Sequence, residues 1–240
     1  MLSKLAPLIG CLALILPAAV SNAAEMVLRG VSYPFFNEAG QLTHRIIADS
    51  ATKNGEQRKL SGVLVEYFEA GDPKRVTQRI TASEATWSET RQTLAGDGAI
   101  VIETDVNRLS GEGFLFTLPR SQVEIQRRFA MSNDEVDLTS DRAIVDLVLE
   151  RDGKGETDVR VRDIKRCEAI GNLHLKVRPA ARGKYEVDEA RSERAVYDGP
   201  THTIKIPQNA QMMHKGRPWT SSEFTYTLDQ KSRPALKLAK

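Results

Sequence analysis

Apolar and polar residues alternate along much of this chain. In the stretch GNLHLKVR (171–178), apolar residues take every second position and polar residues lie between them. The stretches 61–69, 142–150, 201–207 and 224–228 share this period of two. Successive side chains of a β-strand point to opposite faces, so this pattern predicts a series of half-buried strands.

Turn-forming residues separate these stretches at short intervals. Glycine and asparagine accept positive φ, so pairs such as Asn54-Gly55 and Asp97-Gly98 indicate reversals of the chain. The segment GEG (111–113) indicates a bulge or bend before the next strand. Strands separated by turns every 8–12 residues or so are typical of sandwiches and barrels. We therefore expect an all-β fold, an antiparallel β-jellyroll or open sandwich.

One pattern occurs twice, with a fixed spacing. The segment FLFTL (114–118) resembles FTYTL (224–228), and 224 − 114 = 110. The same spacing separates Trp87 from Tyr197. Few residues are identical, but apolar and turn positions agree, which indicates a structural repeat. The expected organisation is two tandem repeats, 24–140 and 141–230, followed by a basic tail at 231–240.

Composition and charge exclude some functions. The chain has 240 residues, 40% of them hydrophobic, which is enough for a sizeable core. The 34 basic and 32 acidic residues leave a net charge of +2. This balance gives no basic footprint for nucleic acid, so we expect no nucleic-acid partner.

The N-terminal segment, 1–23, has the features of a signal peptide. An apolar run from Leu5 to Val20 follows a lysine, and small residues precede Ala24. The run is shorter than the roughly 20 residues of a membrane helix, so we expect export and cleavage before Ala24. The alternative is an uncleaved inner-membrane anchor. A cleaved chain keeps one cysteine, Cys167, and so forms no internal disulfide.

The sequence contains no recognisable catalytic or metal-binding motif. None of its four histidines has the spacing of a zinc site, and neither a nucleophile elbow nor a Walker loop occurs. The acidic segment DEVD (134–137) fits a solvated turn. We therefore expect a non-enzymatic protein without metal or cofactor.

Two parts of the chain resemble a known family. Residues 33–71 and 79–104, with their stepped alanines and glycines, resemble the periplasmic lipopolysaccharide-transport proteins of the LptC type. Residues 169–177, 190–206 and 221–228 resemble the related LptA (OstA-type) pattern, with a turn at Gly171-Asn172. LptC-type proteins usually hold one such unit behind an uncleaved membrane helix, whereas two units occur here.

The resemblance implies a periplasmic β-jellyroll that carries lipopolysaccharide from the inner toward the outer membrane. Its apolar face would hold the acyl chains of lipid A. The implied partners are lipopolysaccharide and other bridge components or further copies, joined by pairing of edge strands. The candidate lipid-binding groove consists of Val63, Val65, Ile100, Ile102, Phe114, Phe116, Leu118, Leu173, Leu175, Phe224, Tyr226 and Leu228.

Two other functions fit the same sequence. One is an exported adaptor or structural module, a closed β-sandwich that binds protein or polysaccharide. The other is a β-rich carbohydrate-active enzyme, in which His174 or the acidic cluster at 134–137 would be essential.

The signal peptide gives the first testable prediction. When the full chain is expressed in a Gram-negative host, N-terminal sequencing of the periplasmic form should begin at Ala24. Replacing the small residue before the cleavage site, Ala23→Arg, should leave a longer, membrane-associated product. A wild-type product that keeps residues 1–23 would instead support the uncleaved anchor.

Overall fold

The computed structural model describes residues 27–37, 39–69, 72–151, 159–178 and 187–228. The predicted signal segment and the basic tail lie outside the described residues.

The described residues form β-strands, one short 3₁₀ turn and no α-helix. None of their segments is a helix long and apolar enough to cross a membrane. The elements are β1 (Val27–Phe36), β2 (Leu42–Asn54), β3 (Gln57–Glu69), β4 (Asp72–Ser88), β5 (Thr93–Thr104), β6 (Arg108–Thr117), the 3₁₀ turn (Leu118–Arg120), β7 (Gln122–Ser132), β8 (Val136–Ser140), β9 (Arg142–Arg151), β10 (Val159–Val177), β11 (Glu189–Asp198), β12 (Thr203–Ile206), β13 (Ala210–His214), β14 (Arg217–Ser221) and β15 (Phe224–Thr227).

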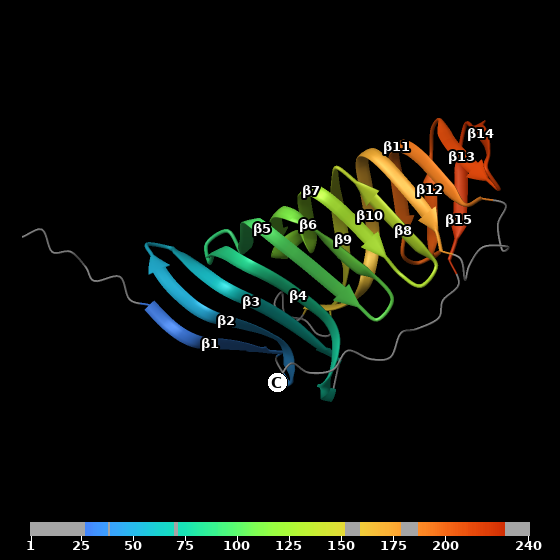
Figure 1. Cartoon of the computed structure of the whole chain (residues 1–240). Helices are drawn as coiled ribbons and strands as arrows, with labels where there is room; N and C mark the ends of the chain where they lie inside the picture. The colour runs from blue at the N-terminus through green and yellow to red at the C-terminus, as the bar shows by residue number, and fades with distance from the viewer. Residues whose placement is uncertain (1–26, 38, 70–71, 152–158, 179–186, 229–240) are drawn as a thin grey trace, which may run out of the picture.

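All fifteen strands belong to one antiparallel sheet, whose order largely follows the sequence. Strands β1 to β8 pair in succession, and β10, β11, β12 and β15 continue the path. Strand β9 pairs with β7 and β10, and β13 joins β11 to β14. Figure 1 shows β1 at one end of the elongated, curved sheet and β13 to β15 at the other. The predicted all-β antiparallel fold is confirmed.

A row of irregular backbone crosses the middle of this sheet. The register shifts where β4 pairs with β5, β5 with β6, β6 with β7, and β10 with β11. Residues with positive φ occupy the row in β1, β3, β6, β7 and β10: Gly30, Gly62, Gly113, Arg128, Gly171 and Asn172. A β-bulge bends its strand and increases the local twist, so aligned bulges bend the whole sheet along one line.

This bend divides the sheet into two layers around one core. Strand β10 lies against β2, β3, β4 and β5, with which it does not pair. Apart from Phe68 and Val76, the buried apolar side chains of the described residues belong to a single cluster, which extends from Ile46 in β2 to Leu228 just after β15. The architecture is therefore a sandwich made by folding one continuous sheet.

Some cross-strand pairs recur with the spacing found in the sequence. Trp87 lies opposite Leu94 in β4 and β5, and Tyr197 lies opposite Ile204 in β11 and β12. The next pairs, Leu94–Phe116 and Ile204–Tyr226, again differ by 110 (204 − 94). The proposed boundary between repeats, at residue 141, lies between β8 and β9, which both pair with β7 and β10. The division into two repeats stays a prediction.

Two expected turns are bulges instead. Asp97-Gly98 lies inside β5 and Gly171-Asn172 lies inside β10, so neither reverses the chain. At Gly98 a Cβ atom would come within 2.6 Å of Ser83 Oγ. Because glycine has no Cβ atom, neighbouring strands can approach each other closely at the bend. Local composition alone does not distinguish a glycine used in this way from a glycine in a turn.

The row of bulges predicts that alanine substitutions at Gly30 and Gly62 lower the free energy of unfolding by different amounts. Gly30 and Gly62 have φ of 60° and 57°, so alanine strains the backbone at both by about 1–2 kcal/mol. A Cβ atom at Gly30 meets nothing within 4 Å, whereas at Gly62 it would overlap the carboxylate of Asp49. Urea unfolding should therefore show Gly62→Ala to be about 1 kcal/mol more destabilising than Gly30→Ala.

The double variant Asp49→Ala/Gly62→Ala tests the cause. Removal of the Asp49 carboxylate should abolish the excess cost, because only the backbone strain remains. Equal destabilisation by Gly30→Ala and Gly62→Ala would contradict the role given to this contact.

Candidate functional site

The predicted groove residues come together in the structure. Ten of the twelve are buried members of the core cluster: Val63, Val65, Ile100, Ile102, Phe114, Phe116, Leu173, Leu175, Tyr226 and Leu228. Leu118 and Phe224 are half-buried and pack against this cluster. All twelve thus lie in or against the interior, and their contact with lipid stays a prediction.

The interior carries two lines of apolar side chains that run across the strands. Residues directly opposite each other in paired strands share a face, so successive pairs define each line. The long apolar row crosses twelve strands, from β1 to β14: Tyr33, Ile46, Val65, Ile80, Ile102, Leu109, Met131, Leu138, Leu175, Ala190, Met212 and Trp219.

The short apolar row crosses nine strands in the other layer, from β4 to β15. Its members are Trp87, Leu94, Phe116, Val123, Val145, Cys167, Tyr197, Ile204 and Tyr226. Burial raises the pKa of the Cys167 thiol, which keeps the group protonated and unreactive. This cysteine therefore serves as a small apolar side chain in the row.

Polar side chains line the interior beside the long apolar row. His44, Tyr67, Gln78 and Thr104 lie opposite one another in β2 to β5, two residues beyond the members of the long row. All four are buried. We call these four residues the polar belt.

The polar belt is uncharged at neutral pH. The His44 ring stacks between Phe35 and Tyr67, with centroid distances of 4.2 and 5.3 Å. Burial lowers the pKa of His44 to about 4 and raises that of the Tyr67 hydroxyl. The surroundings of the belt thus favour neutral groups.

The two layers are also joined by polar contacts, which we call the seam. Asn107, between β5 and β6, donates from Nδ2 to the Tyr197 hydroxyl at 3.5 Å. The Tyr226 hydroxyl donates to Glu135 Oε2, between β7 and β8, at 3.3 Å. Each bond links a turn of one layer to a short-row tyrosine of the other.

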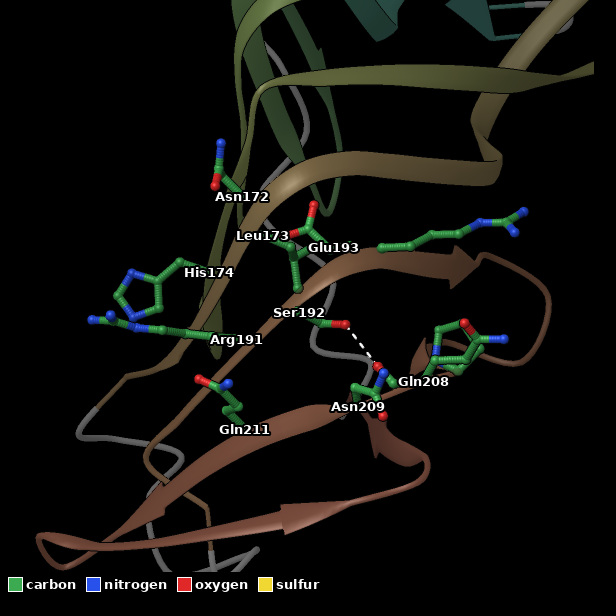
Figure 2. A pocket seen from close by; sticks show the side chains of 11 residues that line it. Asn172, Leu173, His174, Arg191, Ser192, Glu193, Gln208, Asn209 and Gln211 are labelled. Atoms are coloured by element: carbon green, nitrogen blue, oxygen red, sulfur yellow. Dashed lines mark hydrogen bonds between the residues drawn. The ribbon is translucent and has the colours of Figure 1, made fainter.

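The surface also has a polar pocket of about 590 Å³ near the end of the sheet. Its floor lies where β11 passes from β13 to β12, and Ser192 Oγ donates to the Gln208 carbonyl at 2.8 Å. Figure 2 shows His174, Arg191 and Gln211 at this pocket. Leu173 is the predicted groove residue in its lining, which is otherwise largely polar and a poor match to an acyl chain.

The other sequence candidates have structural partners. His174 Nε2 lies 3.1 Å from Glu189 Oε2, and Asp137 accepts two hydrogen bonds from Arg178, at 3.0 and 2.6 Å. Among the described residues, no group of three or more His, Cys, Asp or Glu side chains is arranged to hold a metal ion.

Sequence reasoning alone missed the polar belt. Its members continue the alternation of apolar strands: Gln78 is two residues from Ile80, and Thr104 is two residues from Ile102. The sequence could have indicated the belt through these polar residues, because they lie on the side of the strand that the alternation assigns to apolar residues. The pairing that aligns them across four strands exists only in the folded sheet.

Comparison with known proteins adds no family. No protein-family model matches the sequence, and no curated protein matches it. The fold and its interior define the class: an all-β sandwich, formed by one folded sheet, with an apolar interior that is continuous along its length.

Burial of His44 predicts a loss of stability in mild acid. His44 takes up a proton near pH 6.5 in the unfolded chain, whereas in the folded chain it does so only near pH 4. Stability from this site is therefore complete above pH 6.5 and declines as the pH falls toward 4. Between pH 7 and 5 the loss should be about 2 kcal/mol.

The variant His44→Phe isolates this effect, because phenylalanine keeps the stacked ring but does not titrate. Urea unfolding at pH 7 and pH 5 should show a smaller loss in His44→Phe than in the wild type. The same loss in both proteins would assign the acid sensitivity to other groups.

Proposed function

We propose that this protein is a non-enzymatic periplasmic carrier of lipopolysaccharide, whose lipid A acyl chains pass between the two layers of the sheet toward the outer membrane. The observation that carries the proposal is the pair of apolar rows. The short row lies in or against the interior cluster across nine strands, and the long row does so across eleven, from Tyr33 on β1 to Met212 on β13. The resemblance of the sequence to LptC-type and OstA-type proteins supports the same function.

The geometry of the rows suits transport along the sheet. Neighbouring strands lie about 4.8 Å apart, so twelve strands give a path of roughly 50 Å. Each buried methylene contributes about 0.8 kcal/mol wherever it lies along such a path. Because successive positions offer similar apolar side chains, a chain gains binding energy at each position and meets no single strong site that would hold it.

Lipid entry requires the two layers to separate. Most members of the rows are buried, so an acyl chain must take the place of side chains that pack between the layers. A seam hydrogen bond contributes about 0.5–1.5 kcal/mol net, since water replaces its partner when it opens. The acyl chain covers the apolar surface that opening exposes, which keeps the overall cost low.

The two ends of the sheet support the proposed partners. Val27, Leu28 and Phe36 are exposed on β1, which is an edge strand, and Trp219 is 46% exposed on β14 at the other end. Unpaired strand edges with apolar side chains favour addition of a further strand. We propose that other bridge components or further copies of the chain pair there, with inner-membrane association if the N-terminal segment is retained.

The same edges favour a second candidate, an exported adaptor. Such a module would bind protein or polysaccharide through its edges and keep its interior closed. The two functions differ in whether lipid reaches the interior.

Photo-crosslinking in cells distinguishes them. A photoreactive residue at Phe116, in the short row, or at half-buried Phe224 should form adducts with lipopolysaccharide, because both side chains face the proposed path. Glu124 and Thr225 provide matched controls, since they are exposed and belong to strands beside or containing those positions. Adducts are detected as a mobility shift that reacts with antibody to lipopolysaccharide.

Adducts at 116 and 224 and none at 124 and 225 would support the carrier. Folded, exported protein without adducts at any position would assign the interior to a closed core. The adaptor would then be the better function.

A further inference from the structure

One buried side chain in the interior lacks the hydrogen bonds that its chemistry requires. Gln78 has no exposed surface, and neither its Nε2 nor its Oε1 has a hydrogen-bond partner. Burying polar atoms without partners typically costs 1–3 kcal/mol or so. Leucine or methionine would fill similar space without this cost, so packing alone does not account for the amide.

Gln78 faces the interior between the two layers. It lies opposite Tyr67 and Thr104, whereas the next residue, Arg79, lies opposite Glu66 on the other face of the sheet. Arg79 binds Glu66 at 3.0 Å on that other face. The nearest side chains of the interior row are thus a phenol and a hydroxyl, and the neighbouring charges point away.

The surroundings of the amide select a neutral ligand. His44 at the end of the polar belt is uncharged at pH 7, because burial holds its pKa near 4. A phosphate or carboxylate placed here would lose its hydration, and none of the belt neighbours described above, His44, Tyr67 and Thr104, supplies a cation at pH 7. A hydroxyl or a secondary amide instead both donates and accepts, which matches Oε1 and Nε2 of glutamine.

The long apolar row lies directly beside this amide. Ile80 is two residues away on the same face, roughly 7 Å along the strand. An alkyl chain packed on the row would therefore bring a polar substituent a few carbons along it within reach of Gln78.

We propose that Gln78 binds a hydroxyl or amide group carried by an acyl chain, so that the polar belt selects substituted over plain chains. This inference rests on the proposed function, because it requires a lipid in the interior. Gln78 is then a specificity-determining residue. In the lipid-free protein its unpaired amide lowers the stability of the fold, and a bound hydroxyl or amide group supplies the missing hydrogen bonds.

Binding of two matched probes to the full mature chain tests the proposal. Equilibrium dialysis below the critical micelle concentration compares methyl tetradecanoate with methyl 3-hydroxytetradecanoate, two uncharged esters that differ by one hydroxyl. The wild type should prefer the hydroxylated probe about fivefold to tenfold, the equivalent of one hydrogen bond. Gln78→Leu should lose this preference and still bind methyl tetradecanoate. Gln57→Leu, an exposed position on β3, is the control and should keep the preference.

Thermal unfolding gives a second readout. Gln78→Leu and Gln78→Met should be at least as stable as the wild type without lipid, because both remove a buried unpaired amide. If both variants are strongly destabilised, the amide is a structural requirement and the proposal is wrong.

The outcomes separate this inference from the proposed function. An unchanged preference in Gln78→Leu, with both probes still bound, would overturn the role of Gln78 and leave the carrier function standing. If the wild type binds neither probe and yields no lipopolysaccharide adduct, the carrier function fails, and this inference fails with it.

Discussion

The structure depends on the line of bulges at which the sheet bends. A flat antiparallel sheet of this length would expose one apolar face along its whole extent, which water strongly disfavours. The bend brings the two halves of that face together, so the long and short rows cover each other within one cluster. Glycines such as Gly62 and Gly113 make the bend possible, because positive φ costs them little.

The folded sheet also explains why its interior suits a mobile apolar ligand. Its core is repeated along one axis, with similar side chains on each successive strand, whereas a typical globular core converges on one centre. The polar belt lies beside the long apolar row in β2 to β5, and the seam joins the layers through polar contacts. Together they place a few neutral polar groups along an otherwise apolar interior.

Predictions from the sequence were correct where they depended on side-chain alternation within a single strand. Alternation in 171–178 predicted that Leu173 and Leu175 share one buried face, because a strand has a fixed period of two, and both side chains belong to the core cluster. The prediction of a turn was wrong at Asp97-Gly98, since glycine serves both a turn and a bulge. The polar belt was missed because, within its own strand, Gln78 is a single polar residue at a position where the alternation calls for an apolar one. Only its pairing with Tyr67 and Thr104 in the folded sheet makes it part of a row of polar side chains.

The sequence by itself determined the all-β class and the apolar face of each main strand, because both follow from side-chain alternation and from turn and bulge residues close in the chain. Only the tertiary structure decided that the strands form one sheet, that its bend closes the apolar face into an interior, and that Asn107 meets Tyr197 across 90 residues. These features depend on the register between strands and on contacts between distant segments, and neither is encoded in the period of a single strand.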